Sequence, residues 1–284
     1  MVTFSPAQVC NKIAVAGKGK CGLGWFNMLV RAFLAGAYIA VGAALSTVGS
    51  TGVAAVLGAG IGQVVLGALF PIGLILVVLT GAELFTGDAM FAPMAIAQGY
   101  IKIGGLIKLW ILVYVGNLIG SLFMAFLVSY GPYVSWSAAG VATITAFGTR
   151  AIAITTAKLS YTGTMGFLSC FFKGILCNWL VCLALFLGLA ADEVISKIVA
   201  IWFPIMAFVA TGFEHCVANM YFIPAGIITC VLTGDGPYTL MDILTTMWPN
   251  NIIWATLGNI VGAVILLVIV YHFSFRKECA ACKV

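Results

Sequence analysis

Two stretches of the sequence decide the fold, because each interrupts a long apolar segment with the same pattern of small and polar residues. The first is TGAELFTGD at residues 80–88, and the second is TGFEHCVAN at residues 211–219. Glycine permits backbone angles that break a helix, and such a break persists at membrane depth only where protein or water covers it. Aligning Gly81 with Gly212 brings further pairs into register, namely Glu83 with Glu214, Asp88 with Asn219, Phe91 with Phe222 and Pro93 with Pro224. The sequence therefore predicts an internal repeat in which each half contains a broken apolar helix.

The composition requires a membrane around these segments. Of the 284 residues, 63% are hydrophobic and 7% are charged, whereas a soluble domain carries about 25% charged residues. A chain of this size cannot remove so much apolar surface from water by folding alone. We therefore predict an all-α integral membrane protein and exclude a soluble enzyme. The net charge of +5 is attributed to membrane topology and not to nucleic-acid binding.

Apolar runs predict six transmembrane helices. They cover approximately residues 26–48, 61–97, 105–130, 165–190, 195–230 and 250–273. Crossing about 30 Å of hydrocarbon takes about 20 helical residues, so the second and fifth runs are too long for one unbroken span. We expect a cytoplasmic segment at residues 1–25, a six-helix pore domain at residues 26–273 and a cytoplasmic tail at residues 274–284.

A second repeated motif extends the internal symmetry. The sequence GNLIG at residues 116–120 recurs as GNIVG at residues 258–262, so residues 26–130 and 165–273 form corresponding halves of three spans each. Because three is an odd number, the two halves must cross the membrane in opposite directions. Inverted repeats of this kind place a substrate site at their interface, near the middle of the membrane.

The positions of lysine and arginine predict the orientation. With six spans, one side of the membrane holds Lys12, Lys18, Lys20, Arg31, Lys102, Lys108, Lys197, Arg276, Lys277 and Lys283. The other side holds Arg150, Lys158 and Lys173. Cytoplasmic loops carry the excess of positive residues, so we expect a multi-pass protein of the plasma membrane with both termini in the cytoplasm.

Polar residues in the breaks are candidates for function and for loop bracing. Each break starts a second half-helix, whose free N–H groups and dipole favour an anion. His215 aligns with Leu84, so this ionisable residue has no counterpart in the other half and is expected to act in a site. We expect the other polar residues to brace the loops, in the case of the glutamates by accepting backbone N–H bonds; these residues are Glu83, Glu214, Asn117, Asn219 and Asn259.

Asparagines within the spans have two interpretations. Asn117 and Asn259 either fix the structure around the breaks or line a pore, and the glycines that flank them favour close helix packing. Asn178 stands alone among the apolar residues of the fourth span, which makes it the better candidate for a pore-lining residue.

At these residues the chain resembles the formate/nitrite transporter family. The resemblance rests on GAELFT at 81–86, GNLIG at 116–120, KGILCNWLVC at 173–182, GFEHCVANM at 212–220 and GNIVG at 258–262. It extends from about residue 5 to residue 275, and the combination of the fourth-span and fifth-span motifs is highly specific.

The resemblance implies a homopentamer of aquaporin-like protomers, each with its own pore. It implies that Thr86, His215 and Asn178 line the centre of the pore. It further implies an inner apolar constriction at Phe70 and Leu74, and an outer one at Leu84 and Phe208. A lysine before the fourth span attracts the anion in this family, and Lys158 is the best match, with Lys173 as a second source of positive potential.

The expected activity is transport of formate, moved with a proton as the neutral acid. A bare anion in a low dielectric costs many kcal/mol, whereas a neutral acid costs far less. His215 either supplies the proton, since histidine titrates near neutrality, or only orients the acid. Nitrite and hydrosulfide are the alternative substrates, because small weak acids are poorly discriminated by an apolar pocket, and acetate or lactate is expected to leak through.

No cofactor or metal is expected. A haem- or quinone-binding redox subunit is the remote alternative. The chain has two histidines, His215 and His272, which the predicted spans place at opposite ends of the membrane, so a haem with two histidine ligands is geometrically disfavoured.

Overall fold

Long apolar helices account for most of residues 4–281, which are the residues that this computed structural model describes. Six stretches are long and apolar enough to cross a membrane: Trp25–Ser50, Ala59–Thr80, Ile103–Tyr130, Gly163–Ala190, Cys216–Thr233 and Asp242–Cys279. The predicted all-α membrane class with six spans is confirmed. The ends of the two predicted terminal segments, residues 1–3 and 282–284, lie outside the described residues.

The first half of the chain forms seven helices and one strand pair follows it. These elements are α1 (Pro6–Cys21), α2 (Trp25–Ser50), α3 (Val53–Leu57), α4 (Ala59–Leu69), α5 (Ile72–Thr80), α6 (Phe85–Ala97), α7 (Ile103–Tyr130), β1 (Val134–Trp136) and β2 (Ala142–Ile144). The second half comprises α8 (Ala146–Leu159), α9 (Gly163–Ala190), α10 (Val194–Ala210), α11 (Cys216–Thr233), α12 (Asp242–Thr245), α13 (Ile253–Ala263) and α14 (Val270–Ala281). Short π-helical segments, Trp248–Ile252 and Val264–Ile269, flank α13. Strands β1 and β2 pair antiparallel as a hairpin between the halves.

Both predicted helix breaks are present, and glycine ends the helix at each. Gly81 follows α5 with φ of 75°, and Gly212 follows the end of α10 with φ of 71°. Residues with a side chain rarely adopt this left-handed conformation, which is why glycine commonly ends helices. The chain then runs extended for three residues before α6 and α11 begin. The second span has one further interruption at Pro71, whose missing N–H removes a helical hydrogen bond.

Glycines bring the long helices into close contact. Helix α2 packs on α7, and α9 packs on α13 in the same manner. A Cβ atom added at Gly120 would lie 2.0 Å from the carbonyl oxygen of Phe33, and one added at Gly262 would lie 2.3 Å from that of Ile175. These distances leave no room for a side chain. The repeated Gly-Asn-x-x-Gly motif therefore sets the spacing of the helices in both halves.

Among the helices outside the predicted spans, the two longer ones, α1 and α8, each pack against a half-helix. Helix α1 packs on α6, and α8 packs on α11. Helix α1 begins with a capping box, in which the Ser5 side chain accepts the backbone N–H of Gln8 and the Gln8 side chain accepts the backbone N–H of Ser5. The Thr145 side chain caps α8. The apolar periodicity of these segments is too weak to predict spans, but capping residues of this kind are a sequence signal for helix starts.

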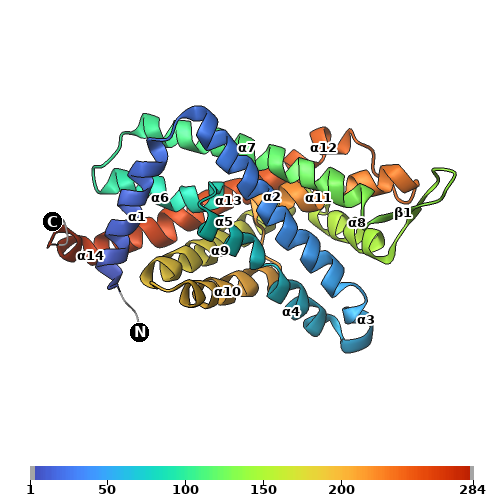
Figure 1. The fold of residues 1–284 in the computed structure, drawn as a ribbon, viewed down its shortest axis with the longest axis horizontal. Coiled ribbons are helices and arrows are strands. Elements are labelled where there is room, and N and C mark those ends of the chain that lie inside the picture. The colour runs from blue at the N-terminus through green and yellow to red at the C-terminus, as the bar shows by residue number, and fades with distance from the viewer. Residues whose placement is uncertain (1–3, 282–284) are drawn as a thin grey trace.

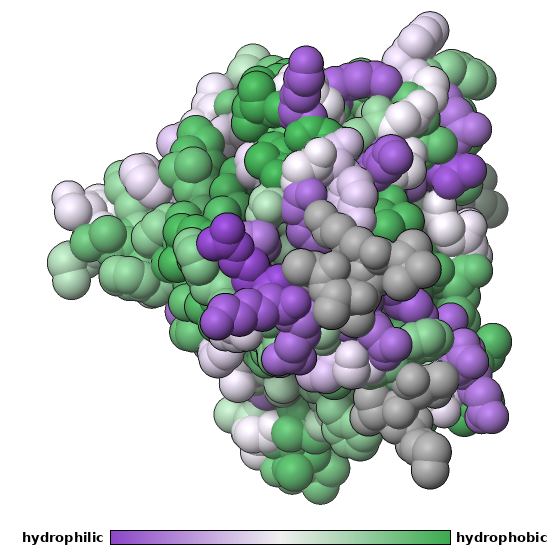
Figure 2. Space-filling model, turned by 90° about the vertical axis from the view of Figure 1, so that its left-hand side faces the viewer, coloured by the Kyte–Doolittle hydropathy of each residue, from purple (hydrophilic) through white to green (hydrophobic). Residues whose placement is uncertain are grey.

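The first and last helices, α1 and α14, lie at one end of the elongated molecule (Figure 1), whereas α8 and the hairpin lie at the other end. Figure 2 views the end that carries α1 and α14, where hydrophilic side chains gather at the centre and along the right-hand side of the face and hydrophobic ones dominate its left-hand side. The polar residues of this end, together with the exposed apolar residues of the long helices, fit a protein whose spans face lipid.

The close helix contacts predict a specific packing defect. Replacing Gly120 with alanine should destabilise the protein by about 1–3 kcal/mol, because overpacking forces the helices apart. Thermal unfolding in detergent would measure this loss. The matched control is Gly104→Ala in the same helix, since an added Cβ there meets nothing within 4 Å. Equal melting temperatures of the two variants would show that the close contact between α2 and α7 does not determine the stability of the protein.

Candidate functional site

Asn117 secures the first helix break from the neighbouring helix α7. Its side-chain nitrogen donates to the carbonyl oxygens of Ala32 (2.8 Å) and Glu83 (2.9 Å), and its oxygen accepts the N–H of Phe85 at 2.9 Å. Glu83 and Phe85 lie on either side of the point where α6 begins. The Asn117 amide thus satisfies backbone groups that would otherwise be unpaired at membrane depth.

Asn259 in α13 makes the equivalent contacts in the second half. Its nitrogen donates to the carbonyl oxygens of Gly174 and Glu214, both at 2.8 Å, and its oxygen accepts the N–H of Cys216 at 2.9 Å. Both asparagines are fully buried. The two halves therefore hold their broken loops with the same set of three hydrogen bonds.

The two breaks meet at a hydrogen bond between Thr86 and His215. The distance between Thr86 Oγ1 and His215 Nε2 is 2.9 Å, and both side chains are buried. His215 Nδ1 accepts the backbone N–H of Ala218 at 3.0 Å. Because an amide N–H can only donate, Nδ1 carries no proton in this geometry, and the neutral ring presents its Nε2–H to the threonine hydroxyl.

Asn178 lies behind this pair and contacts backbone. Its side-chain nitrogen donates to the carbonyl oxygens of Thr86 at 3.0 Å and Asn259 at 2.8 Å. The side chain is fully buried and lines neither of the two cavities described below. Asn178 thus connects the start of α6, at Thr86, with Asn259, the residue that holds the second helix break.

The four residues expected to form apolar constrictions fall into two groups that differ from the expected pairs. The ring of Phe70 lies edge-on to that of Phe208, with centroids 5.7 Å apart, and Phe208 stacks on the His215 ring. Leu74 and Leu84 line the opposite cavity instead. The expected grouping of Phe70 with Leu74 is wrong because the interruption at residues 70 and 71 falls between these residues and divides them between the two cavities.

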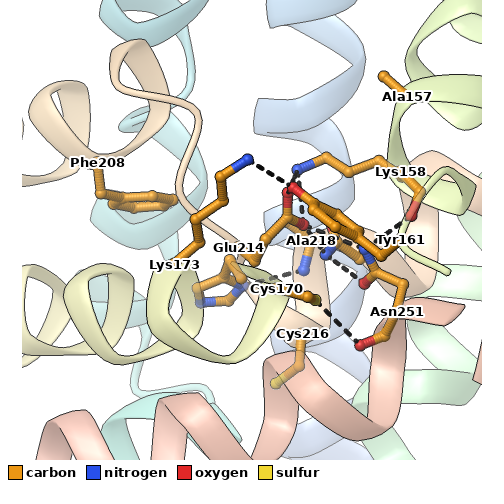
Figure 3. Close-up of polar contacts among 12 residues, drawn as sticks. Ala157, Lys158, Tyr161, Cys170, Lys173, Phe208, Glu214, Cys216, Ala218 and Asn251 are labelled. Atoms are coloured by element: carbon orange, nitrogen blue, oxygen red, sulfur yellow. Dashed lines mark hydrogen bonds and ion pairs between the residues drawn. The ribbon is translucent and has the colours of Figure 1, made fainter. Parts of the chain in front are cut away.

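A cavity of about 420 Å³ opens on the side of α8, and we call it the Lys158 vestibule. Lys158 donates to both carboxylate oxygens of Glu214 at 2.9 Å, and the Tyr161 hydroxyl donates to the same carboxylate at 2.8 Å. Lys173 donates to the Tyr161 oxygen at 2.9 Å. Figure 3 shows the two lysines approaching Glu214 and Tyr161 from opposite sides. Phe222, which stacks on Phe70, also lines this vestibule.

A second cavity of about 320 Å³ opens on the side of α1, and we call it the Lys20 vestibule. Lys20 forms ion pairs with Glu83 and, at 3.2 Å, with Asp88. Arg31 lies 3.9 Å from Glu83, and Phe91 lines the wall beneath the Lys20 ammonium. Burial lowers the pKa of Lys20, but the Asp88 and Glu83 carboxylates outweigh this effect and raise the pKa above its usual value.

The glutamates differ from the sequence-based expectation. Their carboxylates bind lysines from α1 and α8, and no backbone N–H of the loops donates to them within residues 4–281. Asn219 likewise contacts side chains, donating to Glu214 and Asn251 at 2.7 Å each.

Lys20 was missed as a site residue, although a signal exists in the sequence. Lys20 and Lys158 each lie five residues before the first long helix of their half, at Trp25 and Gly163. The repeat therefore extends to the helices that precede the spans, and a search for it there would have paired the two lysines.

The site consists of neutral polar groups enclosed by apolar rings, with positive vestibules at both ends. Such a path suits a small anion at its mouths and an uncharged molecule at its centre. Within the described part of the chain, no group of three His, Cys, Asp or Glu side chains is placed to bind a metal ion.

Comparison with known proteins agrees with this geometry. The formate/nitrite transporter family matches residues 7–273. A probable formate transporter of Methanothermobacter thermautotrophicus is 41% identical over 96% of both chains. The nitrite transporter NirC of Salmonella typhimurium is 35% identical over 88% of this chain and 83% of its own. A solved structure described as a pentameric formate channel with formate bound is 31% identical, with a TM-score of 0.70 over 89% of this chain and 98% of that one. These proteins are transporters and channels rather than enzymes, and this chain belongs to the formate/nitrite transporter family.

Proposed function

We propose that this protein conducts formate across the cell membrane and that formate crosses together with a proton, as neutral formic acid. The observation that carries the proposal is the uncharged Thr86–His215 pair enclosed between two apolar constrictions. The 41% identity to a probable formate transporter supports formate as the substrate.

The vestibules collect the anion, and the constrictions reject its charged form. Lys158, Lys173 and Arg150 line one mouth, and positive walls raise the local concentration of a small anion. Phe70 and Phe208 offer no hydrogen bond to a carboxylate, so a bare charge between them loses its hydration without compensation. Protonation at this boundary removes that cost, and the falling dielectric favours the neutral acid.

The hydrogen bonds of His215 favour an orienting role over that of a stored proton. A second proton on the ring would sit on Nδ1 and face the N–H of Ala218, which is a donor as well. The neutral ring instead presents its Nε2–H at the centre of the protein, where the Thr86 hydroxyl is hydrogen-bonded to it. The permeating acid is thus aligned by neutral donors while its proton comes from water at the vestibule.

Nitrite is the second candidate substrate, because a nitrite transporter is 35% identical to this chain. Hydrosulfide fits the same chemistry of a small weak acid, and acetate is expected to pass more slowly through rings of this size. A haem-binding role has no support, since His215 lies at the centre of the protein and His272 lies in α14.

The assembly and orientation are proposed from similarity and from charge. The solved relative described as a pentameric formate channel supports a homopentamer with one pore in each protomer. Helices α1 and α14 lie at the same end of the molecule (Figure 1), and most lysine and arginine residues fall on the side of the predicted spans to which these helices belong, which supports a cytoplasmic location for both termini. On this proposal the Lys20 vestibule faces the cytoplasm.

Replacing His215 with phenylalanine should lower formate flux at least about tenfold. The replacement removes the Nε2–H donor and leaves the Thr86 hydroxyl without its hydrogen-bond partner. Flux would be measured with labelled formate in proteoliposomes. Size-exclusion chromatography would verify that the oligomer is intact. Flux equal to that of the unmodified protein would rule out a role for this hydrogen bond.

Because the two constrictions lie in series, widening one of them should broaden substrate selection less than widening both. Phe208→Ala and Leu74→Ala should each admit acetate modestly, and the double variant should admit acetate and lactate several-fold faster, since side-chain size and not a charged filter sets the limit. Uptake rates of formate, acetate and lactate give the comparison. An unchanged acetate-to-formate ratio in the double variant would locate the constrictions elsewhere.

Cotransport with a proton predicts acidification without current. Formate added outside should acidify the interior of proteoliposomes containing a pH dye, and acid outside should speed uptake because the neutral fraction rises. Protein-free liposomes and the His215→Phe variant control for diffusion of formic acid through lipid. A large formate current in planar bilayers without internal acidification would instead indicate a simple anion channel.

A further inference from the structure

The two vestibules carry nearly the same charges. Among the described residues, three cationic side chains line each of them: Lys158, Lys173 and Arg150 on one side, and Lys20, Arg31 and Lys197 on the other. Each vestibule also contains the glutamate of its helix break, Glu214 or Glu83. The Lys20 vestibule has one further carboxylate, Asp88, where the repeat places the neutral Asn219 in the Lys158 vestibule.

Asp88 is a buried carboxylate that forms an ion pair with Lys20. Its side chain is fully buried, and one oxygen lies 3.2 Å from the Lys20 ammonium. Apart from this ion pair, neither carboxylate oxygen has a hydrogen-bond partner among residues 4–281. Asn219, by contrast, donates to Glu214 and Asn251. In the described chain, Asp88 therefore takes no part in a side-chain hydrogen-bond network like that of Asn219. Its side-chain contact is the ion pair with Lys20.

The extra carboxylate changes what each lysine offers to an incoming anion. Lys158 faces one carboxylate, that of Glu214, whereas Lys20 faces two. A charge that is already neutralised by fixed partners attracts a mobile anion weakly. The raised pKa of Lys20 is consistent with this strong neutralisation by its neighbours.

We propose that Asp88 is an affinity-setting residue, which acts as a built-in counter-ion of Lys20 and makes the protein bind its small anion more weakly from the Lys20 side than from the Lys158 side. The inference rests on the proposed transport of a small monovalent anion, although it does not depend on whether that anion is formate or nitrite. In a passive path at equal pH and zero voltage, the ratio of maximal rate to half-saturating concentration is the same from both sides. The asymmetry therefore appears in the half-saturating concentration itself, with a matching difference in maximal rate.

The test compares membrane vesicles of opposite orientation, each presenting one vestibule to labelled formate, with equal pH and a clamped zero voltage. Asp88→Asn should lower the half-saturating concentration on the Lys20 side by about three- to tenfold, which corresponds to one unit charge roughly 6 Å from the anion at an effective dielectric constant of about 40–80. The half-saturating concentration on the Lys158 side is the internal control and should change by less than about twofold. Raising the salt concentration from about 0.1 M to 1 M should reduce the effect of the substitution, because salt screens fixed charges.

Two further variants separate charge from structure. Lys20→Gln combined with Asp88→Asn restores the net charge of the vestibule and should return the half-saturating concentration toward its original value. Asn219→Asp introduces the same charge into the Lys158 vestibule and should raise the half-saturating concentration on that side alone. This second variant tests the inference even if Asp88→Asn fails to assemble, which size-exclusion chromatography would reveal.

The outcomes distinguish this inference from the proposed function. Absence of formate flux in the unmodified protein would overturn formate transport, and the same vesicles would then be assayed with nitrite. Flux with half-saturating concentrations that neither Asp88→Asn nor Asn219→Asp alters would overturn the role of Asp88 while leaving transport intact. Equal changes on both sides would also overturn it, because a general structural effect has no preference for one vestibule.

Discussion

The structure depends on satisfying the backbone where two helices are broken inside the membrane. An unpaired N–H or carbonyl group in hydrocarbon costs several kcal/mol, and each break exposes several of them. Asn117 and Asn259 meet this requirement with three hydrogen bonds each, from helices that glycines allow to approach closely. Once the loops are fixed, Thr86 and His215 can face each other at the centre. The packing of α7 and α13 against their neighbours thus determines where Thr86 and His215 lie at the centre of the path.

The proposed path combines two opposing requirements along its length. On that proposal the vestibules attract a charged species, and the apolar side chains between them exclude it. Cationic side chains come from α1, α2, α8, α9 and α10, at the ends of the spans, while the aromatic and leucine side chains lie nearer the middle. If formate crosses as the neutral acid, as proposed above, this separation of charge attraction from charge exclusion allows fast capture of the anion without tight binding at the centre.

Much of the fold could be predicted from the sequence because membrane helices leave a strong apolar signal. The six spans, the breaks at Gly81 and Gly212 and the family all followed from residue pattern and motif. Helices α1 and α8 could not be predicted in this way, since neither has a long apolar run and each buries only part of its residues.

The grouping of the candidate site residues was harder to predict. Phe70 and Leu74 are one helical turn apart, and sequence spacing alone places them together; the interruption at Pro71 separates them. The glutamates were assigned to backbone bonds because their lysine partners are 56 and 63 residues away in the chain. Long-range ion pairs of this kind leave no local pattern.

The hydrogen bond between Thr86 and His215 joins one residue from each half of the chain, and the two halves differ in sequence at the position that the imidazole occupies. A dimer of two identical half-length chains would have to place the same residue at both breaks, giving two leucines or two histidines at the centre. A single polypeptide with two different halves is free of that restriction. In this chain one break carries an apolar residue, Leu84, and the equivalent position of the other break carries the imidazole of His215. One imidazole at the centre, opposite an apolar residue at the equivalent position, therefore requires a chain whose two halves differ in sequence while they remain similar in shape.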